Sequence, residues 1–329
     1  TASRYEEDVQ RVPSSLIVLT SQDLANSGAS SINEAISRLT GIIGRPSLYG
    51  GHEINLDLGG FGDAASSNLV VVIDGVPYKQ GDASEVRLSS LALEQIERVE
   101  IQRGASTVLY GEGAVGGVIN IITHKGLAEP GGTVGVSLGS NNTREMKASV
   151  GTRLDAWRFL VSGSRYETDN HRDNFHNRQT NGLLRATWSE GANLLSFQWG
   201  VESGEGGLPG GITVQDFVTA PKKSYKPLDN GRNDSRHLGI NGEFDLGTWR
   251  AAFDLNRKNV NIDANYVADD FNSQNKTGST RAGVRTWRNW SHEGLVHKFL
   301  IGADAEHWSQ ERNTNYGNTT VDQPSNAWF

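Results

Sequence analysis

Residues Ile96 to Thr123 decide the fold: they read IERVEIQRG from Ile96 to Gly104 and YGEGAVGGVINIIT from Tyr110 to Thr123. Val99 and Ile101 alternate with polar neighbours, which is the period-two pattern of a strand with one buried face. Val118 to Ile122 is a β-branched apolar run interrupted only by Asn120, and such runs favour strands. The stretch therefore predicts two short strands joined through a glycine-rich turn.

The glycines at 111, 113 and 116 also spell GxGxxG, a pattern found in dinucleotide-binding loops. That function requires a helix after the glycines, so that a pyrophosphate can lie at the helix N-terminus. Here Val118 to Ile122 follows and favours a strand, and a second glycine cluster at Gly60 to Ala65 likewise precedes the strand-like run Leu69 to Ile73. Nucleotide binding is therefore disfavoured at both places.

The composition excludes several classes of protein. The chain has 329 residues, 39 glycines and 21% charged residues, which disfavours a helical bundle and allows two domains. It has no cysteine, so disulfide frameworks, thiolate zinc sites and cysteine nucleophiles are excluded. The net charge of -7 disfavours nucleic acid as a partner. No stretch approaches the roughly 18 apolar residues of a membrane-spanning helix, although barrel strands would escape that test.

The first third predicts a small mixed unit. Val12 to Thr20 resembles an extended segment, and Ser31 with Glu34 forms a capping-box pattern at the start of one short amphipathic helix that ends before Gly41. Strands are expected at Glu53 to Leu58 and at Leu69 to Ile73.

From Gly131 the chain consists of alternating segments, in which one face is apolar and the other polar. Turns near 155, 191, 247 and 294 are short, whereas 170–177, 205–234 and 265–276 are long, and four tryptophans, Trp157, Trp188, Trp249 and Trp290, lie near the short turns. This rhythm is typical of an outer-membrane barrel with an aromatic girdle, and a soluble β-sandwich is the alternative. The nine strands expected are 133–139, 144–154, 157–168, 178–189, 193–204, 235–245, 249–264, 277–292 and 296–312.

The last stretch, Asn313 to Phe329, lacks alternation and is expected to be a loop. Nine strands are too few for a barrel wide enough to hold a domain of this size, which takes about 22, and single-chain bacterial barrels have an even number of strands. The chain is therefore expected to be the N-terminal part of a longer protein, or its described part.

The quoted stretch resembles the end of the plug domain in TonB-dependent outer-membrane receptors, where the signature is IExVExxRG followed by LYGxxAxGGVINIIT. The resemblance covers roughly Val9 to Lys125, and Leu69 to Pro77 is similar to the family's LVLIDGVP. One departure is Gly59, which stands where family members usually carry the arginine of IRGFG.

The resemblance implies a mainly β protein with a small α+β plug, in which residues 1–130 form the plug and 131–329 the N-terminal portion of a large antiparallel transmembrane barrel. It implies a transporter in the outer membrane of a Gram-negative bacterium, embedded in lipid, with no covalently bound cofactor and no catalytic site. The cargo would be a scarce nutrient, a ferric siderophore or similar iron chelate, or alternatively cobalamin, haem or another cofactor. A TonB-type partner would act on a short box expected upstream of Thr1.

Loops that rise toward the outer face in this family correspond to residues 45–52 and 78–82. Candidate ligand contacts there are Arg45, Tyr49, His52, Tyr78, Lys79 and Gln80, whose alternative role is packing against the barrel wall. His171 and His176 are further candidates from a long loop, with solvated loop residues as the alternative. Lys222, Lys223, Tyr225 and Lys226 could attract an anion, or belong to a surface loop.

Three charged residues of the signature, Glu97, Glu100 and Arg103, are expected to hold the plug, either to the wall or to itself, because charges in such a setting need partners. No HExxH motif, paired catalytic carboxylates or serine-histidine-aspartate pattern is visible, so no enzyme is predicted. The competing hypothesis from another class is a surface β-barrel protein that binds without transporting.

Overall fold

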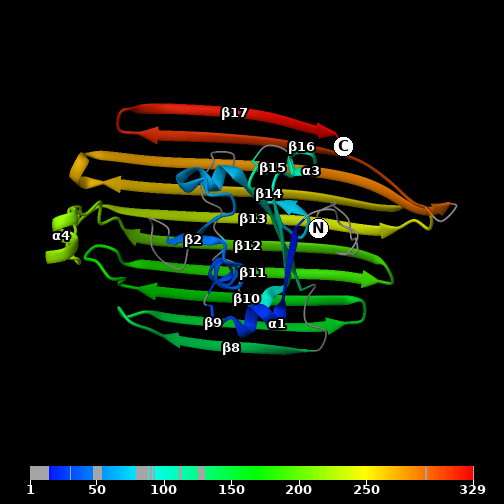
Figure 1. Cartoon of the computed structure of the whole chain (residues 1–329), viewed down its shortest axis with the longest axis horizontal. Coiled ribbons are helices and arrows are strands. Elements are labelled where there is room, and N and C mark those ends of the chain that lie inside the picture. The colour runs from blue at the N-terminus through cyan, green and yellow to red at the C-terminus, as the bar shows by residue number, and fades with distance from the viewer. Residues whose placement is uncertain are drawn as a thin grey trace. The chain divides into compact units, whose positions relative to one another are not determined.

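The computed structural model describes residues 15–29, 31–46, 54–78, 88, 91, 93–110, 113–124, 130–292 and 295–328. The chain forms two compact units, Thr1–His124 and Lys125–Phe329, each considered by itself (Figure 1). Among the described residues no helix is long and apolar enough to cross a membrane. The division into a plug at 1–130 and a barrel portion at 131–329 stays a prediction.

A five-stranded sheet forms the centre of the first unit. Its strand order is β1-β6-β7-β4-β5, in which β4 and β7 are parallel and the other neighbours antiparallel. The strands run over β1 (Leu16–Thr20), β4 (Leu69–Ile73), β5 (Val76–Pro77), β6 (Ile96–Arg103) and β7 (Gly117–Thr123). The two strands expected around the glycine-rich turn are therefore confirmed as β6 and β7, which lie side by side.

Short helices accompany the sheet. The expected helix is α2 (Ile32–Thr40), where the Ser31 hydroxyl accepts a hydrogen bond from the Glu34 N–H and Gly41 ends the helix in the left-handed conformation at φ +66°. The expectation of a single helix is wrong, because α1 (Ser21–Asn26) and α3 (Thr107–Tyr110) also form. A complete capping box between Thr20 and Asp23 starts α1, and it was missed because no apolar periodicity follows it.

The core of the first unit lies between α2 and the sheet. Its fully buried side chains come from both elements and include Ile32, Ile36, Val99, Ile101 and Ile119. Each such side chain contributes about 1.5–3 kcal/mol on leaving water. A two-stranded hairpin, β2 (Ile43–Pro46) with β3 (Ile54–Asp57), and the 3-10 helices η2 (Gly62–Asn68) and η3 (Leu93–Gln95) complete the unit.

Gly117 must be a glycine for two reasons. Its φ is +149°, and a Cβ there would lie 2.3 Å from the Gln102 carbonyl oxygen on the neighbouring strand β6. The glycine-rich turn thus lets β7 enter the sheet close against β6. It leads into a strand and not into a helix, as the sequence predicts.

The second unit is one antiparallel meander of ten strands, in which each strand pairs with the next along the chain (Figure 1). The strands are β8 (Gly131–Leu138), β9 (Arg144–Leu154), β10 (Trp157–Thr168), β11 (Asn177–Glu190), β12 (Asn193–Gly207), β13 (Asn230–Asp245), β14 (Arg250–Tyr266), β15 (Phe271–His292), β16 (Leu295–Thr314) and β17 (Gly317–Trp328). A short helix α4 (Val214–Thr219) lies in the connection between β12 and β13, at the end of the sheet that also carries the β14–β15 and β16–β17 turns (Figure 1).

Two expectations for this unit are wrong. The stretch expected to be a terminal loop forms β17, which pairs with β16 from Thr314↔Gly317 to Ala303↔Trp328, so there are ten strands instead of nine. The expected loop 265–276 shrinks to the short turn around η4 (Val267–Asp269), and β15 begins already at Phe271. Both segments carry polar residues on both faces, so backbone pairing continues where the period-two signal has ended.

On one face of this sheet most apolar side chains are exposed, whereas many polar side chains of the other face are buried, together with a few apolar ones such as Leu160 and Trp287. On β12, Phe197 is 42% exposed whereas Ser196 is 8%, and on β14 Leu255 is 47% exposed whereas Asp254 is 5%. A soluble sandwich buries its apolar face against a second sheet, but the described part of this unit holds one sheet only. The sandwich alternative is therefore wrong, and the pattern is the one of a sheet that meets lipid.

Candidate functional site

Arg98 is the centre of the charged cluster in the first unit. Its Nη1 donates to the Glu97 carboxylate at 2.5 Å and its Nε to the Glu100 carboxylate at 2.9 Å. A register shift in β6 between Ile96 and Arg98 accompanies this contact of one side chain with both carboxylates. The second Glu100 oxygen accepts from Asn120 Nδ2 on β7 at 3.2 Å. The Glu100 carboxylate is nearly buried, with 7% of its side chain exposed, so it depends on these donors.

The contacts described for the three expected plug-holding residues lie within the first unit. Glu97 and Glu100 bind Arg98, and Arg103 Nη2 donates to the Thr40 carbonyl at the end of α2, at 3.0 Å. A role in holding the plug stays a prediction. Sequence reasoning missed Arg98 itself, although its position two residues before Glu100 on one strand face is a usable signal.

Asp57 at the end of β3 occupies a ring of backbone donors. Its Oδ1 accepts from the N–H groups of Gly59, Gly60 and Phe61 at 3.2, 2.7 and 2.9 Å, and its Oδ2 from Gly62 at 2.8 Å. Burial raises the pKa of Asp57, but these four donors outweigh burial and hold that pKa below its usual value. The glycine loop that resembles an anion cradle is thus filled by a carboxylate of the chain itself.

Asp74 at the end of β4 joins the two parallel strands. Its carboxylate accepts from the Thr123 N–H at 2.9 Å and from the Thr123 hydroxyl at 2.6 Å, and its own N–H donates to the Ile121 carbonyl. The residue adopts φ +51°, and Gly75 follows at φ +85°. The Asp-Gly turn therefore fastens the end of β4 to the end of β7, a contact that sequence reasoning did not foresee.

Arg45 and Tyr78 are the two expected ligand contacts of the first unit that the structure describes. Arg45 lies on β2 with 52% of its side chain exposed and forms a loose pair with Asp63 at 3.6 Å. Tyr78 follows β5, donates its N–H to the Val71 carbonyl at 2.7 Å and packs partly against the core. The Arg45 side chain is therefore accessible to solvent, whereas Tyr78 is fixed by its backbone hydrogen bond and by packing against the core. Tyr49, His52, Lys79 and Gln80 lie outside the described residues.

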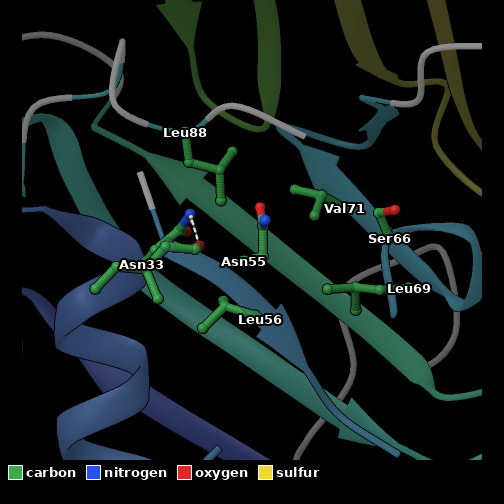
Figure 2. A pocket seen from close by; sticks show the side chains of 8 residues that line it. Asn33, Asn55, Leu56, Ser66, Leu69, Val71 and Leu88 are labelled. Atoms are coloured by element: carbon green, nitrogen blue, oxygen red, sulfur yellow. Dashed lines mark hydrogen bonds between the residues drawn. The ribbon is translucent and has the colours of Figure 1, made fainter. Parts of the chain in front are cut away.

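A cavity of about 30 Å³ lies between α2, β3 and β4 in the first unit. Its lining mixes apolar and polar side chains. Asn33 Nδ2 donates to the Ile54 carbonyl at 2.8 Å, a hydrogen bond that is dashed beside Asn33 in Figure 2. This volume holds about one water molecule. The cavity is therefore far too small for a metal chelate and belongs to the packing of the unit. The lining residues are Asn33, Ile54, Asn55, Leu56, Ser66, Leu69, Val71 and Leu88.

His171 and His176 lie in the connection between β10 and β11. The His171 ring contacts Phe175 edge-on at 5.5 Å, and the His176 carbonyl accepts from the Gly207 N–H at 2.9 Å. Within the described part of the chain no three histidine, aspartate or glutamate side chains gather at a point that could hold a metal ion. The two histidines thus lie in the connection between β10 and β11, without a metal-binding arrangement among the described residues.

The connection 208–229 is fastened to this histidine loop. Arg172 donates to the carbonyls of Gly210 and Lys223 at 2.9 Å each, and Asn174 donates to the carbonyls of Lys226 and Asp229 at 2.6 and 2.8 Å. The sequence predicted a long loop here, and the structure shows an ordered one that carries α4.

Two of the three lysines of that loop already have acidic partners. Lys223 pairs with Asp216 at 2.9 Å, and Lys226 pairs with Asp269 at 2.6 Å. The Tyr225 hydroxyl also donates to Asp216, and this hydrogen bond together with Lys223 lowers the pKa of Asp216. The loop is therefore a poor anion attractor, and its charges mainly fasten the loop.

A network of ion pairs runs across β14, β15 and β16 on the polar face of the sheet. Arg281 pairs with Asp304 at 2.8 Å, and Asp254 lies 3.9 Å from Arg281 and 3.5 Å from Arg285. Sequence reasoning did not single out these residues. They alternate with the outward apolar residues along each strand, so the period-two pattern places them together on the polar face. Searching that face of the sequence for opposite charges could have identified them.

Comparison with known proteins agrees with this geometry. Residues 8–118 match the family described as the TonB-dependent Receptor Plug Domain. Over these residues the chain is a plug domain of the TonB-dependent receptor family. The chain is 30% identical over 154 residues to the vitamin B12 transporter BtuB of Vibrio cholerae serotype O1, a match that covers 47% of this chain and 25% of that protein. A BtuB of Vibrio vulnificus is 30% identical over 150 residues, covering 46% and 24%.

Solved structures show the same fold at low sequence identity. The receptor resembles the unliganded ferric citrate transporter FecA with a TM-score of 0.82 and 17% identity, over 96% of this chain and 53% of that one. It resembles the alcaligin receptor FauA of Bordetella pertussis with a TM-score of 0.77 and 14% identity, over 100% and 53%. The receptor chain thus spans about a quarter of its curated relatives and about half of these structures.

Proposed function

We propose that the full-length receptor is an outer-membrane transporter that binds a ferric siderophore or similar iron chelate at its outer face and imports it. The observation that carries the proposal is the combination in one chain of a unit with the plug signature and a sheet whose apolar side chains face outward. In this proposal residues 1–130 are the plug, residues 131–329 begin a barrel of about 22 strands, and the barrel is embedded in the outer membrane of a Gram-negative bacterium.

The energetics of import explain why both units are needed. A barrel wide enough to pass a chelate would leak unless a folded domain closed it. Ligand binding must then favour one plug conformation over another, because a ligand with equal affinity for both shifts nothing. In the proposal a TonB-type partner supplies the mechanical work.

The proposed ligand contacts are Arg45, Tyr49, His52, Tyr78, Lys79 and Gln80 of the first unit and His171 and His176 of the outer loops. Arg45 is the best supported of these, because its guanidinium is half exposed and its pairing with Asp63 at 3.6 Å is loose. A guanidinium binds carboxylate or catecholate oxygens in bidentate geometry. The signature residues Glu97, Glu100 and Arg103 are proposed to keep the plug folded until it is pulled.

Cobalamin is the second candidate cargo, and the relatives named as vitamin B12 transporters favour it. Those matches cover less than half of this chain, whereas the ferric chelate receptors resemble nearly all of it in fold alone. A barrel that binds ligand without transporting it is the candidate from a different functional class.

An uptake experiment tests the proposal. The full-length protein is expressed in cells with and without the energising complex, which then receive iron-55 complexes of citrate, a hydroxamate or a catecholate, or cobalt-57 cyanocobalamin. The proposal expects iron uptake only when the complex is present. Uptake of cobalamin alone would establish the second candidate, and binding that is never followed by uptake would establish the non-transporting protein.

A pair of arginine variants tests the site. Arg45→Gln is expected to weaken chelate binding to the full-length receptor about tenfold, as loss of one charged bidentate contact does. Arg38→Gln is the matched control, because Arg38 already pairs with Glu34 within α2 at 2.5 Å. Equal binding by the wild type and both variants would remove Arg45 from the site.

A further inference from the structure

Three aromatic rings form a stacked row at the tips of two hairpins of the second unit. The Tyr266 and Phe271 ring centroids lie 5.8 Å apart with the planes 29° from parallel, and those of Phe271 and Tyr316 lie 6.0 Å apart at 14°. Tyr266 and Phe271 are opposite each other in the strand register at the β14–β15 turn, and Tyr316 lies in the β16–β17 turn. We call these three residues the aromatic row.

The aromatic row belongs to the polar face of the sheet. Along β14 an even number of residues separates Tyr266 from Asp254, and along β15 an even number separates Phe271 from Arg281, without a shift of register between the two strands. Alternate residues of a strand share one face, so the row lies on the face that carries the ion-pair network. It is therefore distinct from an aromatic girdle, whose side chains face lipid.

One asparagine joins the two turns and fixes the row. Asn315 Nδ2 donates to the Asp270 carbonyl at 2.6 Å, and the Asn315 amide oxygen accepts from the Asn272 N–H at 3.3 Å. Within the second turn the Tyr316 N–H donates to the Thr314 hydroxyl oxygen at 3.2 Å. Tyr316 is therefore held in the row before any ligand arrives, and a preorganised surface loses less conformational entropy on binding.

Tyr316 ends the row with a ring that is open to solvent. The residue is 76% exposed, whereas Tyr266 and Phe271 are half-buried. Stacking across the strands stabilises the pair of Tyr266 and Phe271. Packing accounts for little of a tyrosine with three quarters of its surface in water, so the Tyr316 ring is available to a ligand.

The chemistry around the row favours an uncharged ligand that is rich in hydroxyl groups. The charged residues of the β14–β15 turn are both acidic: Asp269 pairs with Lys226 at 2.6 Å, and Asp270 is exposed. A negatively charged chelate would be repelled at this point. Asn265 and Asn272 are exposed beside the row, and an amide side chain offers both donors and an acceptor.

We propose that the aromatic row binds a pyranose ring of an uncharged, soluble oligosaccharide, with the sugar stacked on Tyr316. The face of a tyrosine ring carries negative charge density, and the C–H groups on one face of a pyranose are weak donors that contact such a surface. The hydroxyl groups at the edge of the sugar then form hydrogen bonds with the exposed amides. This site is separate from the proposed iron cargo, because the acidic turn repels an anionic chelate.

Saturation-transfer NMR with the purified full-length receptor tests the site. The receptor is kept in a detergent without sugar headgroups, and the probes are maltohexaose and cellohexaose, each added to about 10 mM, where even a millimolar contact is well populated. The wild type is expected to bind at least one of the two probes. Tyr316→Ser is expected to weaken this binding about tenfold, whereas Tyr316→Phe, which keeps the ring, should stay within about threefold of the wild type.

Two control variants separate the row from its surroundings. Phe217→Ser removes another aromatic ring, which is 66% exposed on α4 at the same end of the sheet, and is expected to leave sugar binding unchanged. Asp270→Asn removes the acidic charge, and asparagine also adopts the left-handed conformation that Asp270 has at φ +50°. This variant should keep the affinity for the neutral probe and bind the anionic probe hexagalacturonate about two- to fivefold more tightly than the wild type.

Three results would overturn the inference: no binding of either neutral probe to the wild type, equal binding by the wild type and Tyr316→Ser, or an equal loss in Tyr316→Ser and Phe217→Ser. The circular dichroism spectrum verifies that each variant is folded. Iron uptake separates the two proposals. Absence of energised iron uptake by the wild type refutes only the proposed cargo, whereas sugar binding that does not depend on Tyr316 refutes only the aromatic site.

Discussion

Asp57 is expected to hold the glycine loop of the first unit in place, and its replacement gives a graded test. In Asp57→Ala the N–H groups of Gly59, Gly60, Phe61 and Gly62 lose their common acceptor. A hydrogen bond to a charged group contributes about 1.5–3 kcal/mol. The four are not additive, because the loop opens to water once the acceptor is gone. We therefore expect a loss of about 3–5 kcal/mol in the local free energy of opening.

Asp57→Asn separates the charge of the acceptor from its shape. The amide oxygen can still accept from the three donors that contact Oδ1, whereas the amide nitrogen faces the Gly62 N–H in place of Oδ2. Neutral hydrogen bonds are about half as strong as charge-assisted ones. A loss of about 1.5–2.5 kcal/mol is therefore expected, between the wild type and the alanine variant.

Hydrogen exchange followed by mass spectrometry of the full-length receptor measures the effect. Each 1.4 kcal/mol corresponds to a tenfold change in the opening equilibrium, so amides 59–62 are expected to exchange about 10²- to 4 × 10³-fold faster in the alanine variant and about 12- to 60-fold faster in the asparagine variant. Asp63→Asn is the control from the same loop, because its fully exposed carboxylate makes only the 3.6 Å pair with Arg45. Unchanged exchange of these amides in Asp57→Ala would refute the reasoning.

The pH dependence of the same loop has a definite sign. The pKa of Asp57 is lower in the folded protein than its usual value. A carboxyl group with a lowered pKa contributes stability that is complete above the unfolded value of about 3.9 and is lost as the pH falls through the folded value. The loop is therefore expected to keep its protection from pH 8 down to about pH 4 and to lose it below. Loss of protection already at pH 6 would contradict this assignment.

Three further predictions concern other contacts. Arg98→Gln leaves the nearly buried Glu100 carboxylate without its guanidinium partner and should destabilise the first unit by about 3–5 kcal/mol. Glu97→Gln changes a more exposed partner of the same arginine and should cost under about 1 kcal/mol. Equal hydrogen-exchange rates of the β6 amides in both variants would disprove this difference. Gly117→Ala places a Cβ 2.3 Å from the Gln102 carbonyl oxygen and should cost at least about 1–3 kcal/mol by the same measurement. The control Gly135→Ala on β8 meets nothing within 4 Å and should leave the exchange rates unchanged. Unchanged exchange rates in Gly117→Ala would mean that β6 and β7 separate easily. Asp216→Asn mimics the protonated carboxyl group, and the contacts with Tyr225 and Lys223 lower the pKa of that group in the wild type. Tryptic cleavage after Lys223 should therefore be faster in the variant than in the wild type at pH 7. Identical cleavage rates would show that these contacts do not hold the loop.

Local chemistry made much of the first unit predictable. The cap at Ser31, the left-handed stop at Gly41 and the β-branched runs of β4 and β7 depend on neighbours in sequence, so propensity and periodicity locate them. The same holds for the strands of the second unit wherever one face is apolar and the other polar. Strands β9 and β10 begin and end at the predicted residues for this reason.

The strand ends beyond the apolar band were not predictable in this way. In β17 and at the start of β15 both faces are polar, so the alternation that marks a strand is absent although the backbone still pairs. Hydrogen bonding between strands depends on a neighbouring strand that can lie far away in sequence, and the side-chain pattern of one strand does not predict that pairing. The tenth strand, β17, is therefore recognised only by its pairing with β16, because its own sequence shows no alternation.

The charged contacts were likewise predictable only in part. Sequence alone identified a charged signature that needs partners, because buried charges require them. Only the tertiary structure showed that Arg98 contacts both glutamates and that the Asp57 carboxylate accepts hydrogen bonds from the glycine loop that follows it. The physical reason is that strand register decides which side chains meet, and register is a property of two strands together.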